Sequence, residues 1–188
     1  GKTYTMEGTS KEPGLAPRAM SRLFQVMDER SDSGNFEHEC FLSMVEIYNE
    51  NIRDLLADPS EDNSKKRYDI QRDPALGMYV RDLVTAQVSS AGGAQELITE
   101  GHTHRSVGVT NLNEQSSRSH MLLTLTVLTT NVRSGQRHVG KLSLCDLAGS
   151  ERLSKIDTKG AALKETQAIN KSLSALGSVL NALARNEA

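Results

Sequence analysis

The sequence predicts an α/β fold in which helices cover both faces of a central sheet. Three apolar runs, 40–48, 121–131 and 138–146, have the length and composition of buried strands. Between and after them, apolar residues recur every three or four positions, which is typical of helices that bury one face. Strands that alternate with helices in this way indicate a sheet with helices on both sides. The 188 residues are enough for one domain with a hydrophobic core.

The first predicted helix begins at Pro17, because proline is favoured in the first turn of a helix. Met20, Leu23, Phe24 and Met27 follow at helical spacing. These four side chains make one apolar face, which predicts that this helix packs on the sheet.

The middle of the chain alternates between the two periodicities. The run 40–48 is almost continuously apolar, as expected for a strand that is covered on both faces. The following segment, 49–56, is predicted to form a short helical turn. Strands broken by a turn at 74–77 come next, and a second helix runs from Ala94 toward Arg105.

The last predicted element is a long amphipathic helix. Its apolar positions alternate by threes and fours: Ala162, Ile169, Leu173, Leu176, Leu180 and Leu183. A coiled coil is the alternative, although the stripe spans only about three heptads. The chain opens on Gly1 without a preceding strand and ends inside this helical pattern, so we expect a fragment of a larger domain.

Composition excludes several function classes. Lys and Arg number 22 against 24 Asp and Glu, and the net charge of −2 argues against general binding of nucleic acid or of membrane surfaces. Aromatic residues make up only 4%, and no apolar run approaches the roughly 20 residues of a membrane span. Cys40 and Cys145 both lie in apolar runs and are predicted to be buried, reduced thiols. The histidines show no metal-ligand spacing.

The segment "KLSLCDLAG", 141–149, carries the first chemical signal. An apolar strand ends in Asp146, and Gly149 follows three residues later. A carboxylate at this point can hold Mg²⁺ through water, and a glycine lets a backbone N–H approach a terminal phosphate. The alternative is that Asp146 only caps the next turn.

Two further segments point to the same chemistry. Gly1-Lys2-Thr3 matches the end of a phosphate-binding loop, although the tripeptide alone is weak evidence. The polar run from Asn113 to His120 stands directly before a strand and contains neither Gly nor Pro. Its hydroxyls and its guanidinium suit the positioning that triphosphate hydrolysis requires. A polar loop that is held together by serine hydroxyls is the alternative.

Five segments, in this order, resemble the signature segments of the kinesin motor domain: "GKTYTMEG", "EIYNENIRDLL", "NEQSSRSH", "DLAGSE" and "INKSLSALG". The resemblance implies a P-loop NTPase-type mixed central sheet with helices on both faces, truncated at both ends. It implies one motor-domain fragment, 1–188, from the end of the P-loop through the relay helix. The sequences of the first and last segments are most similar to those of the C-terminal-motor, minus-end-directed kinesins.

The resemblance also implies roles for individual residues. Nucleotide contacts would come from Gly1, Lys2, Thr3, Tyr4, Asn113, Ser116, Ser117, Asp146 and Gly149. Mg²⁺ would be held by Thr3, Ser117 and Asp146, partly through water. Hydrolysis would depend on Ser116, Ser117, Arg118, Gly149 and Glu151, with Arg118 and Glu151 forming a salt bridge between switch I and switch II. Microtubule contacts would come from Lys155, Lys159, Lys164 and Asn170.

Further expectations concern two single residues and the function as a whole. His120 is predicted to be structural rather than a catalytic base. Gln115 stands where many family members have His. The implied function is a microtubule-stimulated motor ATPase that uses ATP and Mg²⁺, works in the cytoplasm on the microtubule cytoskeleton, and dimerises through a stalk absent from this chain. Because strands from the missing parts belong near the centre of the family's sheet, we expect the isolated chain to fold poorly and to hydrolyse little ATP.

Two alternatives remain at this stage. A generic P-loop nucleotide switch would fit Asp146 and Gly149, but the guanine-reading pattern N-K-x-D does not occur, since Lys171 is followed by Ser172 and Leu173. A kinesin-like module that holds microtubules without cycling is the second alternative.

Overall fold

The computed structural model describes residues 1–9, 11–58, 60, 66–74, 77–107, 118–149 and 161–185. Helices α1 (Lys2–Glu7), α2 (Leu15–Ser31), α3 (Ala91–Val107) and α5 (Ala161–Ala184) surround a sheet. The strands are β1 (Phe36–Tyr48), β2 (Asn51–Asp54), β3 (Ile70–Asp73), β4 (Gly77–Val80), β5 (Ala86–Val88), β6 (His120–Asn131) and β7 (Arg137–Asp146).

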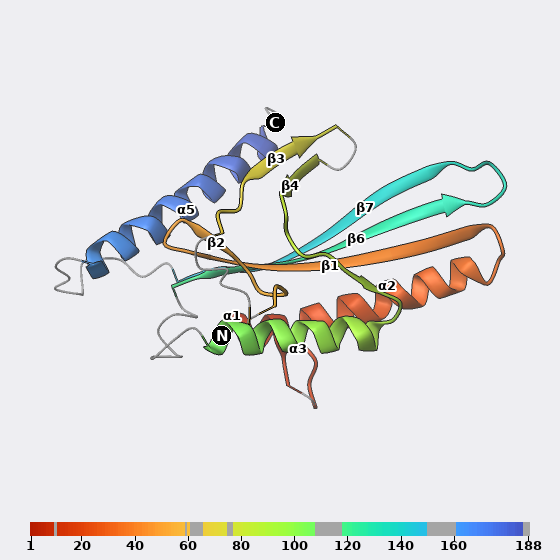
Figure 1. Cartoon of the computed structure of the whole chain (residues 1–188), viewed down its shortest axis with the longest axis horizontal. Helices are drawn as coiled ribbons and strands as arrows, with labels where there is room; N and C mark the ends of the chain where they lie inside the picture. Colours follow the sequence, from red (N-terminus) through yellow and green to blue (C-terminus); the bar gives the residue numbers. More distant parts are fainter. Residues whose placement is uncertain are drawn as a thin grey trace.

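The sheet has the order β2-β1-β6-β7, and β5 pairs with another part of β1. β3 and β4 form a separate two-stranded hairpin. Figure 1 shows α2 and α3 along one side of the sheet, while α5 and the β3–β4 hairpin lie on the other side. The predicted α/β class, with helices on both faces, is confirmed. Every strand pair among the described residues is antiparallel.

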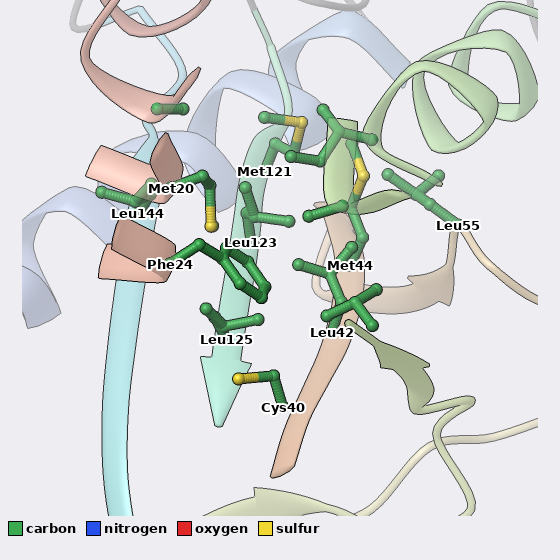
Figure 2. Close-up of a cluster of buried hydrophobic side chains, with 14 of the residues drawn as sticks. Met20, Phe24, Cys40, Leu42, Met44, Leu55, Met121, Leu123, Leu125 and Leu144 are labelled. Carbon is green, nitrogen blue, oxygen red and sulfur yellow. The ribbon is translucent and has the colours of Figure 1, made fainter. Parts of the chain in front are cut away.

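The core lies between the sheet and helices α2 and α3. Figure 2 shows Met20 and Phe24 of α2 facing leucine and methionine side chains of β1 and β6. Leu42, Met44, Leu123 and Leu125 are at most 1% exposed. Burial of such side chains contributes about 1.5–3 kcal/mol each, so this layer is what holds the strands in register.

The prediction for 49–56 is wrong: residues Asn51–Asp54 form strand β2 and not a helical turn. Asn49 and Glu50 both have positive φ, 48° and 62°, and Tyr48 pairs with Asn51 across them. Positive φ at both central residues defines the two-residue turn that best fits the twist of a hairpin. The turn therefore sends the chain back along β1, which overrides the helical spacing of the apolar residues that follow.

Two other predictions need correction. The first helix begins at Leu15, two residues before Pro17, with Gly14 as its N-cap. Cys40 is buried, but Cys145 is exposed. Strand β7 is the last strand of the described sheet, and the β7 residues on the face that carries Cys145 are exposed. Burial raises the pKa of the Cys40 thiol to about 11, so this cysteine is inert at neutral pH.

Candidate functional site

The ends of two neighbouring strands form the centre of the site. β6 and β7 are antiparallel, with Met121 opposite Asp146. The beginning of β6 and the end of β7 therefore lie at the same edge of the sheet, although 26 positions separate His120 from Asp146. This pairing brings Ser119, the residue before β6, to the same end of the sheet as the Asp146–Gly149 segment.

Thr3 and Asp146 are in direct contact at this edge. The Thr3 hydroxyl donates a hydrogen bond of 2.8 Å to Oδ2 of Asp146. Asp146 is only 3% exposed, so its carboxylate is held by the end of β7 and not by solvent. Two residues that the family resemblance assigns to the same Mg²⁺ ion, 143 positions apart, are thus adjacent. Hydroxyl and carboxylate oxygens are the donors that Mg²⁺ prefers, so this pair fits the ion.

A second carboxyl group, that of Glu7, interacts with Asp146. Burial, and then the charge of Asp146, raise the pKa of Glu7 in the last turn of α1. Glu7 Oε1 lies 3.2 Å from Nε2 of His102 in α3. Burial lowers the pKa of His102, so the imidazole is not a fixed positive charge here. The carboxyl groups of Glu7 and Asp146 therefore interact electrostatically in this part of the site.

Lys2 and Tyr4 lie on α1 beside Thr3 and have exposed side chains. The Tyr4 hydroxyl donates a 2.6 Å hydrogen bond to the carboxylate of Glu12. Gly1 is the N-cap of α1. These positions are consistent with the predicted phosphate and adenine contacts, which stay predictions.

The structure places some of the remaining predicted residues and leaves others undescribed. Arg118 is half-buried just before β6, Gly149 is buried after β7, and Asn170 is half-buried in α5. The following predicted residues lie outside the described residues: Asn113, Ser116, Ser117, Glu151, Lys155 and Lys159. Lys164 lies on α5, but its side chain is not described. The predicted pair of Arg118 with Glu151 is therefore untested.

A buried polar cluster behind the strand ends was missed by sequence reasoning. Arg105 donates from Nε to Glu46 Oε1 at 3.2 Å and from Nη2 to Ser119 Oγ at 2.8 Å. Ser119 donates to the same Glu46 oxygen at 2.7 Å. All three residues are buried, Glu46 at 1% exposure and Ser119 at 0%. The cluster ties α3 and β1 to the residue that precedes β6, so it fixes the position of Arg118.

One signal could have found this cluster. Glu46 is the only charged residue in the apolar run 40–48. A carboxylate buried in a strand needs a cation and further donors, because an unpaired buried charge costs several kcal/mol. The partner is Arg105, 59 positions away, and sequence spacing alone does not reveal it.

His120 is confirmed as a residue that is hydrogen-bonded at the beginning of the strand. Nδ1 accepts a 3.1 Å hydrogen bond from the backbone N–H of Ala148, and Nε2 lies 2.7 Å from the Ser172 hydroxyl of α5. Both ring nitrogens are thus engaged by the protein.

Other site types find no support in the described part of the chain. No group of three or more His, Cys, Asp or Glu side chains gathers there as a metal-binding cluster would. Among the described helices, none combines the length and the hydropathy needed to cross a membrane.

Comparisons with known proteins agree with this geometry. The family model of the kinesin motor domain matches residues 1–188. The kinesin-like protein KIN-14S of Arabidopsis thaliana is 48% identical over 184 residues, which cover 98% of this chain and 24% of that protein. The chain thus spans about a quarter of the length of this relative.

Solved structures show the same fold. The C-terminal motor and motor homology domain of Kar3Vik1 superposes with a TM-score of 0.83 at 33% identity, over 97% of this chain and 45% of that one. A fast kinesin, described for its ATPase mechanism and its interactions with microtubules, gives a TM-score of 0.82 at 40% identity, over 100% of this chain and 52% of that one. The resemblance inferred from the five segments, with its leaning toward C-terminal-motor kinesins, is confirmed, and the chain belongs to the kinesin motor domain family.

Proposed function

We propose that this chain forms the nucleotide-sensing part of a microtubule-stimulated motor ATPase. The contact between Thr3 and Asp146 carries the proposal, because it joins the end of the phosphate-binding loop to the strand that precedes switch II. Family membership supports ATP as the nucleotide and microtubules as the partner. The chain is one part of a single motor domain that extends from the end of the P-loop through the relay helix α5.

Thr3 and Asp146 are the described residues that would hold Mg²⁺, together with the predicted Ser117. Because the Thr3 hydroxyl donates its hydrogen to Asp146, its oxygen lone pairs stay available to a cation. The ion, when bound, offsets negative charge on the β- and γ-phosphates. Lys2 is proposed to bind the phosphates, and the backbone N–H of Gly149 to respond to the γ-phosphate.

The hydrolysis geometry is proposed to depend on the segments on either side of the β6–β7 strand ends. Ser116 and Ser117 would position the γ-phosphate and the attacking water, while Arg118 and Glu151 would latch switch I to switch II. Such positioning is the main contribution that a protein makes to phosphoryl transfer.

The proposed interaction surface lies around α5. Lys155, Lys159 and Lys164, with Asn170, are proposed to face the acidic surface of tubulin. The complete protein is proposed to dimerise through a stalk and to work in the cytoplasm on microtubules.

Phosphate release by the complete parent domain, measured with ATP in the presence and absence of microtubules, tests the function. We expect strong stimulation by microtubules. Turnover that ignores microtubules would favour a generic nucleotide switch. Microtubule binding without turnover would favour a non-cycling tether.

The variant Thr3→Ala tests the carrying contact in the same assay. Loss of the hydroxyl removes a proposed ligand of Mg²⁺ and the hydrogen bond to Asp146. We expect turnover to fall about 100-fold, the loss typical of removing one preorganised polar group from such a site. Thr5→Ala is the matched control, since Thr5 lies on the same helix, is exposed, and donates its hydroxyl hydrogen to the Gly1 carbonyl. Equal turnover in Thr3→Ala and Thr5→Ala would contradict the assignment.

A further inference from the structure

His120 connects three parts of the molecule that the nucleotide cycle has to coordinate. It is the first residue of β6, it bonds to Ala148 just beyond β7, and it bonds to Ser172 in the middle of α5. We propose that His120 is a positioning residue that transmits displacement of the 147–149 segment to α5. This inference rests on the proposed function and extends it, because the predicted role of His120 was only to hold the beginning of the strand.

The hydrogen bonds around the ring run in one direction. A backbone N–H can only donate, so the bond from Ala148 leaves Nδ1 without a proton. The proton of the neutral ring is then on Nε2, which donates to the Ser172 hydroxyl. Ser172 in turn donates at 2.7 Å to the carbonyl of Ile169, one turn earlier in α5. The chain of donors therefore begins at the backbone of the 147–149 segment and ends at the backbone of the helix.

Both ends of this series of hydrogen bonds are buried. Ala148 is 3% exposed and Ile169 is 8% exposed, so water does not readily replace either end. Burial also lowers the pKa of His120, which keeps the ring neutral as the bond from Ala148 requires. A buried donor or acceptor that loses its partner costs about as much as a lost hydrogen bond, so a shift of Ala148 must be followed by the ring or be opposed by it.

The His120 ring lies between the proposed nucleotide site and helix α5. Ala148 stands between Asp146, which contacts Thr3, and Gly149, the proposed γ-phosphate sensor. On the other side, Ser172 lies two residues after Asn170, in the helix that is proposed to contact tubulin. His120 is held from behind by its neighbour Ser119, which is fully buried in the Glu46–Arg105 cluster. The His120 backbone is therefore held in place, and its ring is hydrogen-bonded both to the 147–149 segment and to helix α5.

Three substitutions separate the two hydrogen bonds of the His120 ring, which we call the Ala148 arm and the Ser172 arm. In His120→Asn, the side-chain oxygen can take the place of Nδ1 and accept from Ala148, but the Ser172 arm is lost. In His120→Gln, the side-chain nitrogen can take the place of Nε2 and donate to Ser172, but the Ala148 arm is lost. Ser172→Ala removes the second arm from the side of the helix.

The experiment measures ATP turnover of the complete parent domain with and without microtubules, and the microtubule concentration at half-maximal stimulation. We expect all three variants to lower the ratio of stimulated to basal turnover by about three- to tenfold, the size of effect seen for residues that carry coupling. Because both substitutions interrupt the same series of hydrogen bonds, the double variant His120→Asn/Ser172→Ala should lose no more of the stimulation ratio than either single variant. Ser178→Ala is the matched control, since Ser178 makes the same kind of bond within α5, to Ser174, away from the site.

Two results would overturn the inference. One is a stimulation ratio equal to that of the unmodified domain in both Ser172→Ala and His120→Asn. The other is an equal loss of basal turnover and of thermal stability in all variants, with the ratio unchanged, since that would show a packing role only. Failure of the proposed function is a different outcome, because the unmodified domain would then show no stimulation at all.

Discussion

Replacing Arg118 by alanine in the complete motor domain is expected to lower microtubule-stimulated turnover about 100-fold while ATP binding stays nearly unchanged. Arg118 lies directly before Ser119, whose hydroxyl is fixed in the buried cluster with Glu46 and Arg105. Its backbone is therefore held at the beginning of β6, and its side chain is proposed to latch onto Glu151. An exposed ion pair contributes only about 1 kcal/mol, but an error of about 1 Å in the hydrolysis geometry can cost a hundredfold in rate.

The measurement for Arg118→Ala pairs single-turnover phosphate release with binding of a fluorescent ATP analogue. Arg133→Ala provides the control, because Arg133 is an exposed arginine in the turn at the opposite end of the β6–β7 hairpin. If the latch exists, Glu151→Ala should lose the same activity, and the double variant should lose little more. Stimulated turnover that survives in Arg118→Ala would show that the latch is not needed.

The variant Glu46→Ala is expected to lower the free energy of unfolding of the same domain by about 3–5 kcal/mol. The substitution leaves the guanidinium of Arg105, itself 8% exposed, without its carboxylate, and it removes the acceptor of Ser119. The loss of one partner from a buried ion pair is more costly than the loss of both, since the remaining charge stays buried without its counter-ion. The midpoint of urea denaturation in the presence of saturating nucleotide measures the change.

Glu37→Ala is the matched control for Glu46→Ala. Both glutamates lie on β1, but Glu37 is exposed, and substitutions at such positions usually change stability by less than about 0.5 kcal/mol. Glu46→Gln keeps the shape and one acceptor oxygen, so its effect should lie between the two. Equal denaturation midpoints for Glu46→Ala and Glu37→Ala would show that the cluster does not stabilise the domain.

Much of the fold could be predicted from local periodicity. The apolar spacing of Met20, Phe24 and Met27 correctly predicted helix α2, and the apolar runs correctly predicted β1, β6 and β7. The error at β2 has a local cause. Asn49 and Glu50 are not glycine, yet both have positive φ, and that information is not visible in hydrophobic spacing. The exposure of Cys145 depends on the position of β7 at the edge of the described sheet, which is a property of the whole fold.

The candidate site, like the fold, could be predicted only in part from the sequence. The sequence could nominate Thr3 and Asp146 separately, because each occurs in a recognisable local pattern, and the structure shows that they touch. Arg105 has no such pattern around it, and its role depends on a carboxylate 59 positions away. The partners of His120 were equally hidden, since Ala148 takes part through its backbone and Ser172 is one of several serines in α5.

The antiparallel pairing of β6 and β7 has a mechanical consequence. Ten residue pairs join the two strands, and Leu123 and Leu125 reach the core only in this register. A slip of one residue would turn both leucines toward the opposite face, so the pair cannot slide in small steps. The two strands therefore form a rigid hairpin whose open end is at His120 and Asp146. In the proposed nucleotide cycle, displacement of the 147–149 segment would therefore begin at a rigid part of the sheet, and so would any displacement that His120 passes on.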